Sequence, residues 1–181
     1  MPILWWNLEL DVHSSLPYLI DFNPIAIQLG PLAVRWYGLM YLAAFLSFLW
    51  LGKRRSRAGL GPLQVQDVDD LLFYGVLGVV LGGRIGYMLV YGWQQLISDP
   101  ISLIRIWEGG MSFHGGLAGV IIAMVLYGRK QGCGFWRLAD FVAPLVPPGL
   151  MFGRLGNFLN GELWGHVTDK PWGMIFPDSL N

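Results

Sequence analysis

Charged residues are scarce in this chain. Only 13% of its 181 residues are Asp, Glu, Lys or Arg, whereas 54% are hydrophobic and the mean hydropathy is +0.49. Soluble domains usually carry about 25% charged residues. The deficit, together with 9 Trp, 7 Tyr and 25 Gly, is typical of a membrane protein that crosses the bilayer several times. The net charge is zero, so charge gives no argument for a nucleic acid partner.

Cysteine is almost absent. Cys133 is the only one, which excludes an internal disulfide and a cysteine-rich zinc site. We interpret Cys133 as a bystander in a predicted cytoplasmic loop. The histidines His13, His114 and His166 lack the spacing of metal ligands, and no cluster of Asp or Glu accompanies them. We therefore expect no metal site.

A basic leader is missing from the N-terminus. Glu9 and Asp11 lie early, and no small-residue cleavage site precedes the first apolar stretch, so we expect no cleaved signal peptide. Residues 1–31 are mixed in composition and contain prolines. We predict that residues 1–35 form an amphipathic or irregular segment at the outer membrane surface.

Four apolar stretches predict membrane-spanning helices. They cover about residues 36–52, 71–91, 115–128 and 138–152. Several are shorter than the roughly 20 residues that a bilayer usually needs, so we expect flanking residues to complete them. The predicted fold is therefore all-α, a polytopic helical bundle with about four spans within residues 36–153. Residues 154–181 are predicted to lie outside the cytoplasm.

Basic residues predict the orientation. They concentrate after the first span and between the third and fourth: Lys53, Arg54, Arg55, Arg57, Arg129, Lys130 and Arg137. The positive-inside rule assigns both loops to the cytoplasm. The N-terminus, the loop from about Gly92 to Ser112 and everything after Phe152 then lie outside.

Glycines recur at intervals of four residues in the predicted spans. They are Gly78, Gly82 and Gly86 in the second span, Gly115 and Gly119 in the third, and Gly149 and Gly153 at the end of the fourth. Small residues at this spacing let helices pack closely in lipid. We predict that these glycines pack helices against one another.

Arg84 interrupts the second span. It lies about seven residues from the outer end of the span, which is roughly 10 Å at helical rise. A charge at that depth costs a few kcal/mol on insertion scales. Arg84 either snorkels or pairs with a carboxylate, or it faces the bundle interior as part of an anion site, which is the interpretation we favour.

His114 begins the third span, within the glycine-rich segment 108–116. The glycines let the backbone pass close to a substrate, and an imidazole can take a proton from a thiol of pKa about 8.5. A histidine at a helix start is also common as a cap or interface residue, so this pattern alone leaves catalysis open. Ser112 lies close by, but no Gly-x-Ser-x-Gly elbow accompanies it, which disfavours an intramembrane serine protease.

The segment 153–165 is the most informative part of the chain. It follows an apolar, proline-broken stretch and contains Arg154, Asn157, Asn160 and Glu162. The arginine fork suits phosphate, and Asn157 would share a helix face with Arg154. A polar cluster beside lipid is costly unless it handles something polar. The alternative is a structural capping turn outside the membrane.

Four segments, in this order, resemble the prolipoprotein diacylglyceryl transferase family. They are residues 35–41 (RWYGLMY), 82–87 (GGRIGY), 109–116 (GGMSFHGG) and 153–165 (GRLGNFLNGELWG). The resemblance runs from about Asp21 to Pro177. It implies a multi-pass enzyme of the bacterial inner membrane whose active site faces outward. Such an enzyme moves the diacylglyceryl group of phosphatidylglycerol onto the lipobox cysteine thiol of a prolipoprotein signal peptide, forms a thioether, releases glycerol phosphate and needs no cofactor. This is the first step of bacterial lipoprotein maturation.

The resemblance also implies roles for single residues. Arg154 matches the phosphatidylglycerol-binding arginine, and His114 matches a histidine proposed as base, so both are expected to be catalytic. The expected substrate-binding residues are Arg154, Arg84, Tyr37, Asn157, Asn160, Glu162 and Gly165. The family pattern continues beyond the match to Asn181 with further helices and a second essential arginine, so we expect the chain to hold a truncated site.

Two other classes of function remain as alternatives. A lipid or anion transporter would use the arginines as a permeation site, but it predicts inverted repeats and broken helices in matching halves, which the sequence does not show. A non-catalytic assembly subunit would have no need of the polar cluster at the membrane edge.

Overall fold

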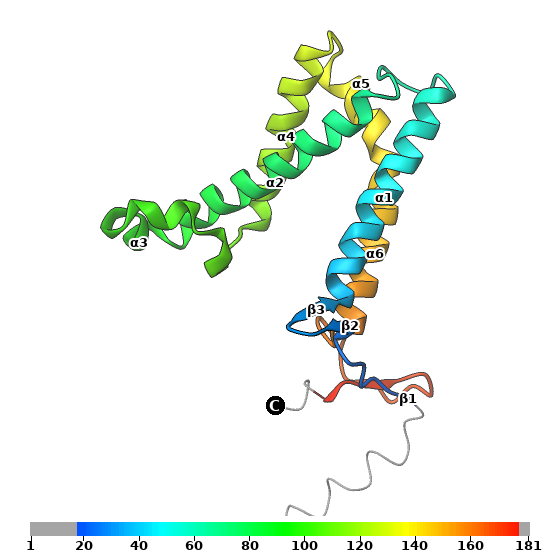
Figure 1. Cartoon of the computed structure of the whole chain (residues 1–181), viewed down its shortest axis with the longest axis vertical. Helices are drawn as coiled ribbons and strands as arrows, with labels where there is room; N and C mark the ends of the chain where they lie inside the picture. Colours follow the sequence, from blue (N-terminus) through cyan, green and yellow to red (C-terminus); the bar gives the residue numbers. More distant parts are fainter. Residues whose placement is uncertain (1–17, 178–181) are drawn as a thin grey trace, which may run out of the picture. The chain divides into compact units, whose positions relative to one another are not determined.

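The computed structural model describes residues 18–177. The expectations for residues 1–17, including His13 and the missing signal peptide, lie outside this range. The described α-helices are α1 (Trp36–Arg57), α2 (Asp67–Val90), α3 (Trp93–Ser98), α4 (Phe113–Lys130), α5 (Phe135–Val142) and α6 (Val146–Leu159) (Figure 1). The shorter elements are the 3₁₀ helices η2 (Pro100–Ile104), η3 (Ile106–Glu108) and η4 (Ala143–Leu145) and the strands β1 (Tyr18–Leu19), β2 (Ile25–Leu29), β3 (Leu32–Arg35) and β4 (Met174–Ile175).

The chain divides into two compact units. The first takes in the chain up to Ala44 and from Leu150 onward, and the second is Phe45–Gly149. The boundaries fall inside α1 and α6, so each of these helices contributes to both units. Each unit is described by itself below.

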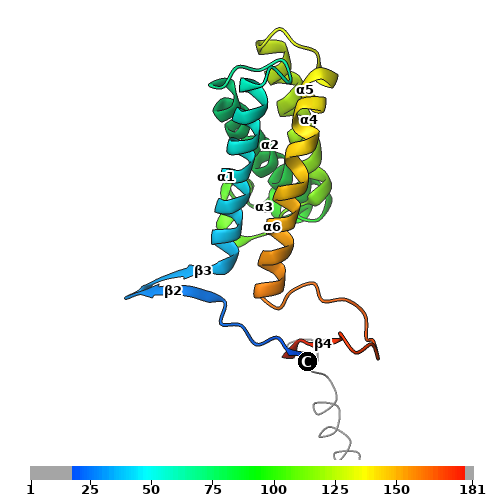
Figure 2. The same ribbon diagram turned by 90° about the vertical axis from the view of Figure 1, so that its right-hand side faces the viewer.

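The first unit contains short strands as well as helix ends. β2 and β3 form an antiparallel hairpin that leads directly into α1 (Figure 2), and β1 pairs with β4 in parallel. Gly30 makes the hairpin turn with φ +59°, a conformation that glycine adopts without steric cost. The expectation of an all-α fold is therefore wrong for residues 25–35, because alternating apolar residues and a Gly-Pro turn favour a hairpin there.

In the second unit, glycine backbones bring α2 and α4 together. A Cβ atom at Gly78 would lie 2.6 Å from the carbonyl oxygen of Gly119, and one at Gly86 would lie 2.7 Å from Cα of Gly115. These distances leave no room for any side chain, so the prediction of close helix packing is confirmed for this pair of helices. No such contact involves Gly149 or Gly153, so that step is not part of the described close packing.

An apolar core fills the second unit at the end of α2 opposite the loop 92–112. It contains Leu63, Val68, Leu71, Met124, Tyr127, Leu138, Phe141 and Leu145. The buried Tyr127 hydroxyl donates to the Asp67 carbonyl oxygen at 2.8 Å and accepts from the Gln131 side chain at 2.9 Å. This polar contact inside an apolar cluster ties the end of α4 to the start of α2.

Both basic loops lie beside the start of α2. Lys53, at the end of α1, pairs with Asp69 at 2.8 Å, and Lys130, at the end of α4, pairs with Asp70 at 4.0 Å. The two loops predicted to be cytoplasmic therefore lie on the same side of this unit. The loop 92–112 follows the opposite end of α2.

The helices coincide with the predicted spans, but the structure supports membrane crossing for only one of them. Within residues 18–177, only α2 is both long and apolar enough to cross a membrane by itself. The crossing of α1, α4 and the α5–α6 segment stays a prediction. So does the division of the chain into an outer segment, a membrane region and an outer C-terminal segment.

Candidate active site

His114 is the second residue of α4. Ser112 caps this helix: its hydroxyl accepts a hydrogen bond from the Gly115 amide at 3.2 Å, and its backbone is extended. A serine at an N-cap satisfies an amide that the helix leaves unpaired. The imidazole of His114 is exposed, and its ring lies edge-on to the ring of Phe113 with centroids 5.6 Å apart. The structure thus presents a histidine without a hydrogen-bond partner among the described residues, directly after a fixed cap.

The connection from α3 to α4 is organised around Arg84. This side chain is only 3% exposed, although it lies on a predicted membrane helix. Its Nε donates to the Leu103 carbonyl at 3.1 Å, and one terminal nitrogen donates to the carbonyl of Ser102. The other terminal nitrogen donates to the carbonyls of Gly109 and of Gly110, the latter at 3.3 Å. The guanidinium therefore binds backbone oxygens at both ends of the connection.

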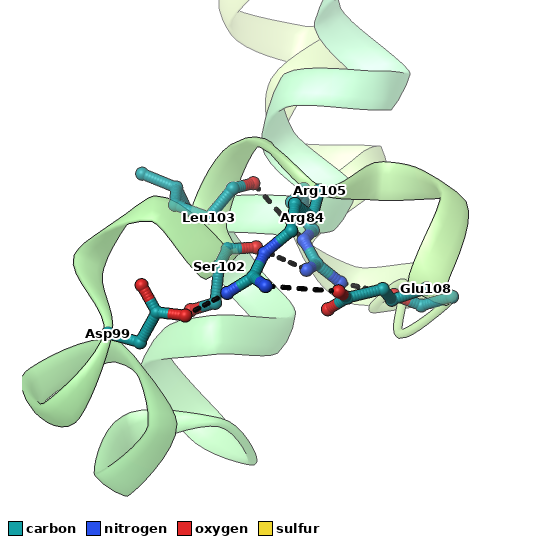
Figure 3. Close-up of polar contacts among 7 residues, drawn as sticks. Arg84, Asp99, Ser102, Leu103, Arg105 and Glu108 are labelled. Atoms are coloured by element: carbon teal, nitrogen blue, oxygen red, sulfur yellow. Dashed lines mark hydrogen bonds and ion pairs between the residues drawn. The ribbon is translucent and has the colours of Figure 1, made fainter.

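A second arginine, Arg105, lies within this connection itself. Arg105 forms ion pairs with Asp99 and with Glu108, the latter at 3.3 Å, whereas Arg84 contacts backbone oxygens only (Figure 3). The charges of Arg105 are paired within the loop. The two arginines thus have different kinds of partner, backbone carbonyls for Arg84 and carboxylates for Arg105.

These contacts leave Arg84 without a free pair of parallel N–H donors. We considered snorkelling, a carboxylate partner or an anion site for this residue, and the described contacts match none of these directly. Its donors are directed at carbonyl oxygens, and its burial keeps solvent away. The prediction that Arg84 binds substrate stays a prediction, with no exposed donor pair to support it.

An apolar cavity of about 470 Å³ lies beside the start of α4. It is lined by Val79, Gly83, Met111, Ser112, Phe113, Gly116, Leu117 and Val120. The lining comes from α2, from the last residues before α4 and from the first turns of α4. A cavity of this kind suits a hydrocarbon chain rather than a polar group.

In the first unit, the end of α6 presents the polar cluster. Arg154 is exposed, and no hydrogen bond or ion pair engages its side chain among the described residues. Asn157 and Asn160 each donate a side-chain hydrogen bond to the Glu162 carboxylate, at 3.4 and 3.2 Å. The backbone amide of Glu162 donates a hydrogen bond to the backbone carbonyl oxygen of Asn157 at 2.8 Å. The side-chain oxygen of Asn160 is buried and has no hydrogen-bond partner among the described residues.

Tyr37 belongs to the same cluster. It packs against the α6 backbone, since a Cβ at Gly156 would lie 3.1 Å from its ring. Its hydroxyl shares a hydrogen bond of 3.1 Å with that of Tyr41. The structure therefore brings Tyr37, Asn157, Asn160 and Glu162 together within one unit.

Gly165 stands apart from this cluster. It is exposed, and a Cβ there would meet no atom within 4 Å. The chain turns just before it at Leu163, which has φ +54°. Among residues 18–177, no group of three His, Cys, Asp or Glu side chains gathers as a metal site would require.

Comparison with known protein families identifies the family to which the chain belongs. Residues 24–181 match the family model described as prolipoprotein diacylglyceryl transferase. The chain belongs to this family. The prolipoprotein diacylglyceryl transferase family was also the one that the four sequence segments resemble, and that prediction is confirmed.

Three relatives, all named phosphatidylglycerol–prolipoprotein diacylglyceryl transferase, illustrate the similarity. The protein of Nitratidesulfovibrio vulgaris (strain DP4) is 60% identical over 156 residues, which are 86% of this chain and 59% of the relative. The Aeromonas hydrophila protein is 58% identical over 92% of this chain and 61% of its own length. The Bordetella avium protein is 57% identical over 88% and 61%. The chain thus spans about three fifths of the length of these transferase relatives.

Sequence reasoning missed several residues that shape the two clusters. Tyr41 was not singled out, although its spacing of four from Tyr37 places both on one helix face. The carbonyl partners of Arg84 could not be found, because backbone oxygens carry no residue-type signal. The ion pairs of Arg105 could have been predicted from sequence, because the acidic residues Asp99 and Glu108 lie close to it on either side.

Proposed function

We propose that this chain carries residues that bind lipid and move protons in a diacylglyceryl transferase. The substrates are phosphatidylglycerol and the lipobox cysteine of a prolipoprotein signal peptide. Arg154 binds the phosphate, His114 accepts the thiol proton, and Asn157, Asn160, Glu162 and Tyr37 orient the headgroup. Neither a metal nor an organic cofactor enters the scheme.

The proposed reaction balances without an added reagent. The cysteine sulfur attacks the carbon of the diacylated glycerol that bears the phosphate. A carbon–sulfur bond forms as the bond between this carbon and the phosphate oxygen breaks, and glycerol phosphate leaves. The electron pair remains on the phosphate oxygen, and the thiol proton passes to the His114 imidazole. Thiolate is the reactive form of cysteine, so a nearby base favours attack. A fixed guanidinium stabilises the negative charge that grows on the leaving phosphate.

The observation that carries the proposal is the free guanidinium of Arg154. It is exposed and unpaired among the described residues, one turn before a hydrogen-bonded Asn157–Glu162–Asn160 set. An arginine without a protein partner keeps its paired donors available for a phosphate.

The surroundings of His114 support the second role. The imidazole is exposed and follows a capped helix start, and its chain neighbour Phe113 lines an apolar cavity of about 470 Å³. An acyl chain in that cavity would bring the lipid to the same stretch of α4. The thiol step requires a proton acceptor near the reacting sulfur, and an exposed imidazole in the first turn of α4 can serve as one.

The proposed setting is the inner membrane of a bacterium, with the chain crossing several times. The apolar helix α2 and the common side of the two basic loops support this topology. The N-terminus and the loop 92–112 would face outward, so transfer would take place toward the outer face. This reaction would be the first step of lipoprotein maturation.

The test uses a chimera in which residues 24–181 replace the matching part of the Aeromonas hydrophila relative. Transfer from labelled phosphatidylglycerol to a lipobox peptide is measured in lipid nanodiscs. Arg154→Ala is expected to lower transfer by about 100-fold, as loss of a donor to a developing anion does, and Arg129→Ala, another exposed arginine, serves as control. Normal transfer by Arg154→Ala would remove the phosphate role, and bound lipid without transfer in the unsubstituted chimera would favour transport.

The proton role needs its own variant. His114→Gln keeps size and polarity but cannot accept the thiol proton. We expect transfer to fall by about 100-fold while binding of phosphatidylglycerol is retained. Unchanged turnover would make His114 a structural residue.

A further inference from the structure

We propose that Arg84 is a positioning residue: its buried guanidinium fixes the backbone that presents His114 and does not itself bind the lipid phosphate. The inference rests on the proposed role of His114. It reassigns a residue for which the sequence alone favours an anion site. Three features of the second unit support it.

The first feature is the use of the donors. A guanidinium has five N–H groups, and four hydrogen bonds from Arg84 end on the carbonyls of Ser102, Leu103, Gly109 and Gly110. A phosphate needs two parallel donors of one fork. Binding one would require Arg84 to release the loop, and a side chain that is 3% exposed offers no route to do so.

The second feature is the way the charge is compensated. Among residues 18–177, no carboxylate pairs with Arg84, whereas its neighbour Arg105 has both Asp99 and Glu108. Carbonyl dipoles therefore take the place of a counter-ion. Lysine cannot reproduce this arrangement, because its three donors radiate from one nitrogen while the carbonyls lie around a planar fork.

The third feature is the path from Arg84 to the imidazole. Gly109 and Gly110 have φ +81° and +79°, a region that glycine occupies readily and other residues rarely do. Two residues later, the Ser112 amide donates to the Gly83 carbonyl at 2.9 Å. Adjacent residues of α2 thus hold the chain on both sides of Met111, and Ser112 then caps the helix on which His114 is the second residue.

This arrangement explains why a charged residue is retained inside an apolar helix. Both carbonyls of the Gly109–Gly110 turn accept hydrogen bonds from Arg84, so the guanidinium helps to fix this turn. A catalytic group displaced by about 1 Å can lose on the order of 100-fold in rate. Fixing this turn is therefore a role in catalysis without contact with the substrate.

The kinetic test uses Arg84→Lys and Arg84→Gln in the same full-length chimera. Both are expected to lower kcat by about 100-fold with KM for phosphatidylglycerol within about two-fold of the unsubstituted chimera, because uniform binding is untouched. Arg129→Gln is the control. A raised KM with normal kcat would assign Arg84 to the lipid, and normal turnover of Arg84→Lys would show that charge alone suffices; either result overturns the proposal.

A second variant perturbs the contact between Arg84 and the Gly109 carbonyl without changing Arg84 itself. Gly109→Ala strains a backbone at φ +81° but its Cβ would meet no atom within 4 Å. Gly132→Ala, at φ +65° and also in open space, is the matched control in another loop. We expect Gly109→Ala to lower kcat and Gly132→Ala to leave it unchanged. Equal kcat for both variants would overturn the proposal even if the Arg84 variants fail to fold.

A chemical readout separates this inference from the proposed function. In the 181-residue chain with His13→Gln and His166→Gln, His114 is the remaining histidine of the 3. Its rate of modification by diethyl pyrocarbonate, followed against pH in nanodiscs, reports its surroundings without any turnover. Arg84→Lys should change this profile and Arg129→Gln should not. If the unsubstituted chimera shows no transfer, the proposed function fails, and the modification profile still decides whether Arg84 positions His114.

Discussion

The amide of Ser112 donates a hydrogen bond to the carbonyl oxygen of Gly83 at 2.9 Å. The residue that caps α4 is thereby bonded to the middle of α2. The contact is possible because the two helices approach each other at their glycine backbones, where Gly86 lies against Gly115. The position of His114 therefore depends on the packing of α2 against α4. Variants that separate these helices should also move the start of α4.

Gly78→Ala tests this packing. The new Cβ would lie 2.6 Å from the Gly119 carbonyl oxygen, which is backbone and cannot move aside cheaply. Overpacking of this kind costs about 1–3 kcal/mol, so we expect a lower unfolding midpoint in detergent titrations. Gly75→Ala on the same helix is the control, because its Cβ would meet no atom within 4 Å and alanine favours helix by about 1 kcal/mol. Equal midpoints for the two variants would contradict the described packing.

Tyr127→Phe tests the polar contact in the apolar core. The hydroxyl is buried and bonds to the Asp67 carbonyl and the Gln131 side chain. Its removal leaves both groups without this partner, and a lost buried hydrogen bond costs about 1 kcal/mol. Tyr91→Phe is the matched control, because Tyr91 is 71% exposed. The measurement is the free energy of unfolding in detergent, and no difference between the two variants would refute the role of the hydroxyl.

The helices could be predicted from hydropathy, but their ends could not. The first apolar stretch ends before Lys53, whereas α1 continues to Arg57. Lys and Arg are good helix formers, and Lys53 gains a partner in Asp69. Charge therefore ends the predicted span without ending the helix. Pro144 lies at the start of η4, between α5 and α6, because proline tolerates the first turn of a helix but not its interior.

The residues of the candidate site could be named from sequence more easily than their partners. Arg154, Asn157 and Glu162 lie within a few positions of one another, so local spacing was enough to group them. Arg84 is different, since its partners lie 18 to 26 residues away and are backbone oxygens. Nothing in residue identity marks such an acceptor, and only the folded connection reveals it.

Gly156→Ala tests the contact between α6 and Tyr37. The added methyl would lie 3.1 Å from the Tyr37 ring and 3.4 Å from Cβ of Met40, so the ring must shift by a few tenths of an ångström. We expect stability to change by less than about 1.5 kcal/mol, because the added methyl meets side chains and not backbone, while transfer by the chimera falls. Gly153→Ala, with open space around its Cβ, is the stability control. Full transfer by a folded Gly156→Ala variant would show that the position of Tyr37 is not critical.

Two variants of Glu162 separate the effect of hydrogen bonding from the effect of charge in the polar cluster. Its two carboxylate oxygens accept from Asn157 and Asn160, and Arg154 is not among its partners. Glu162→Ala leaves both amides unpaired, and loss of a hydrogen bond to a charged group costs about 1.5–3 kcal/mol, or roughly 10- to 100-fold in kcat/KM if the cluster orients the headgroup. Glu162→Gln should be milder, since Asn160 can rotate its amide and direct its unpartnered oxygen at the new donor. Both variants are measured in the chimera with labelled phosphatidylglycerol. Equal loss in the two would mean that the negative charge of Glu162 itself is what the cluster requires.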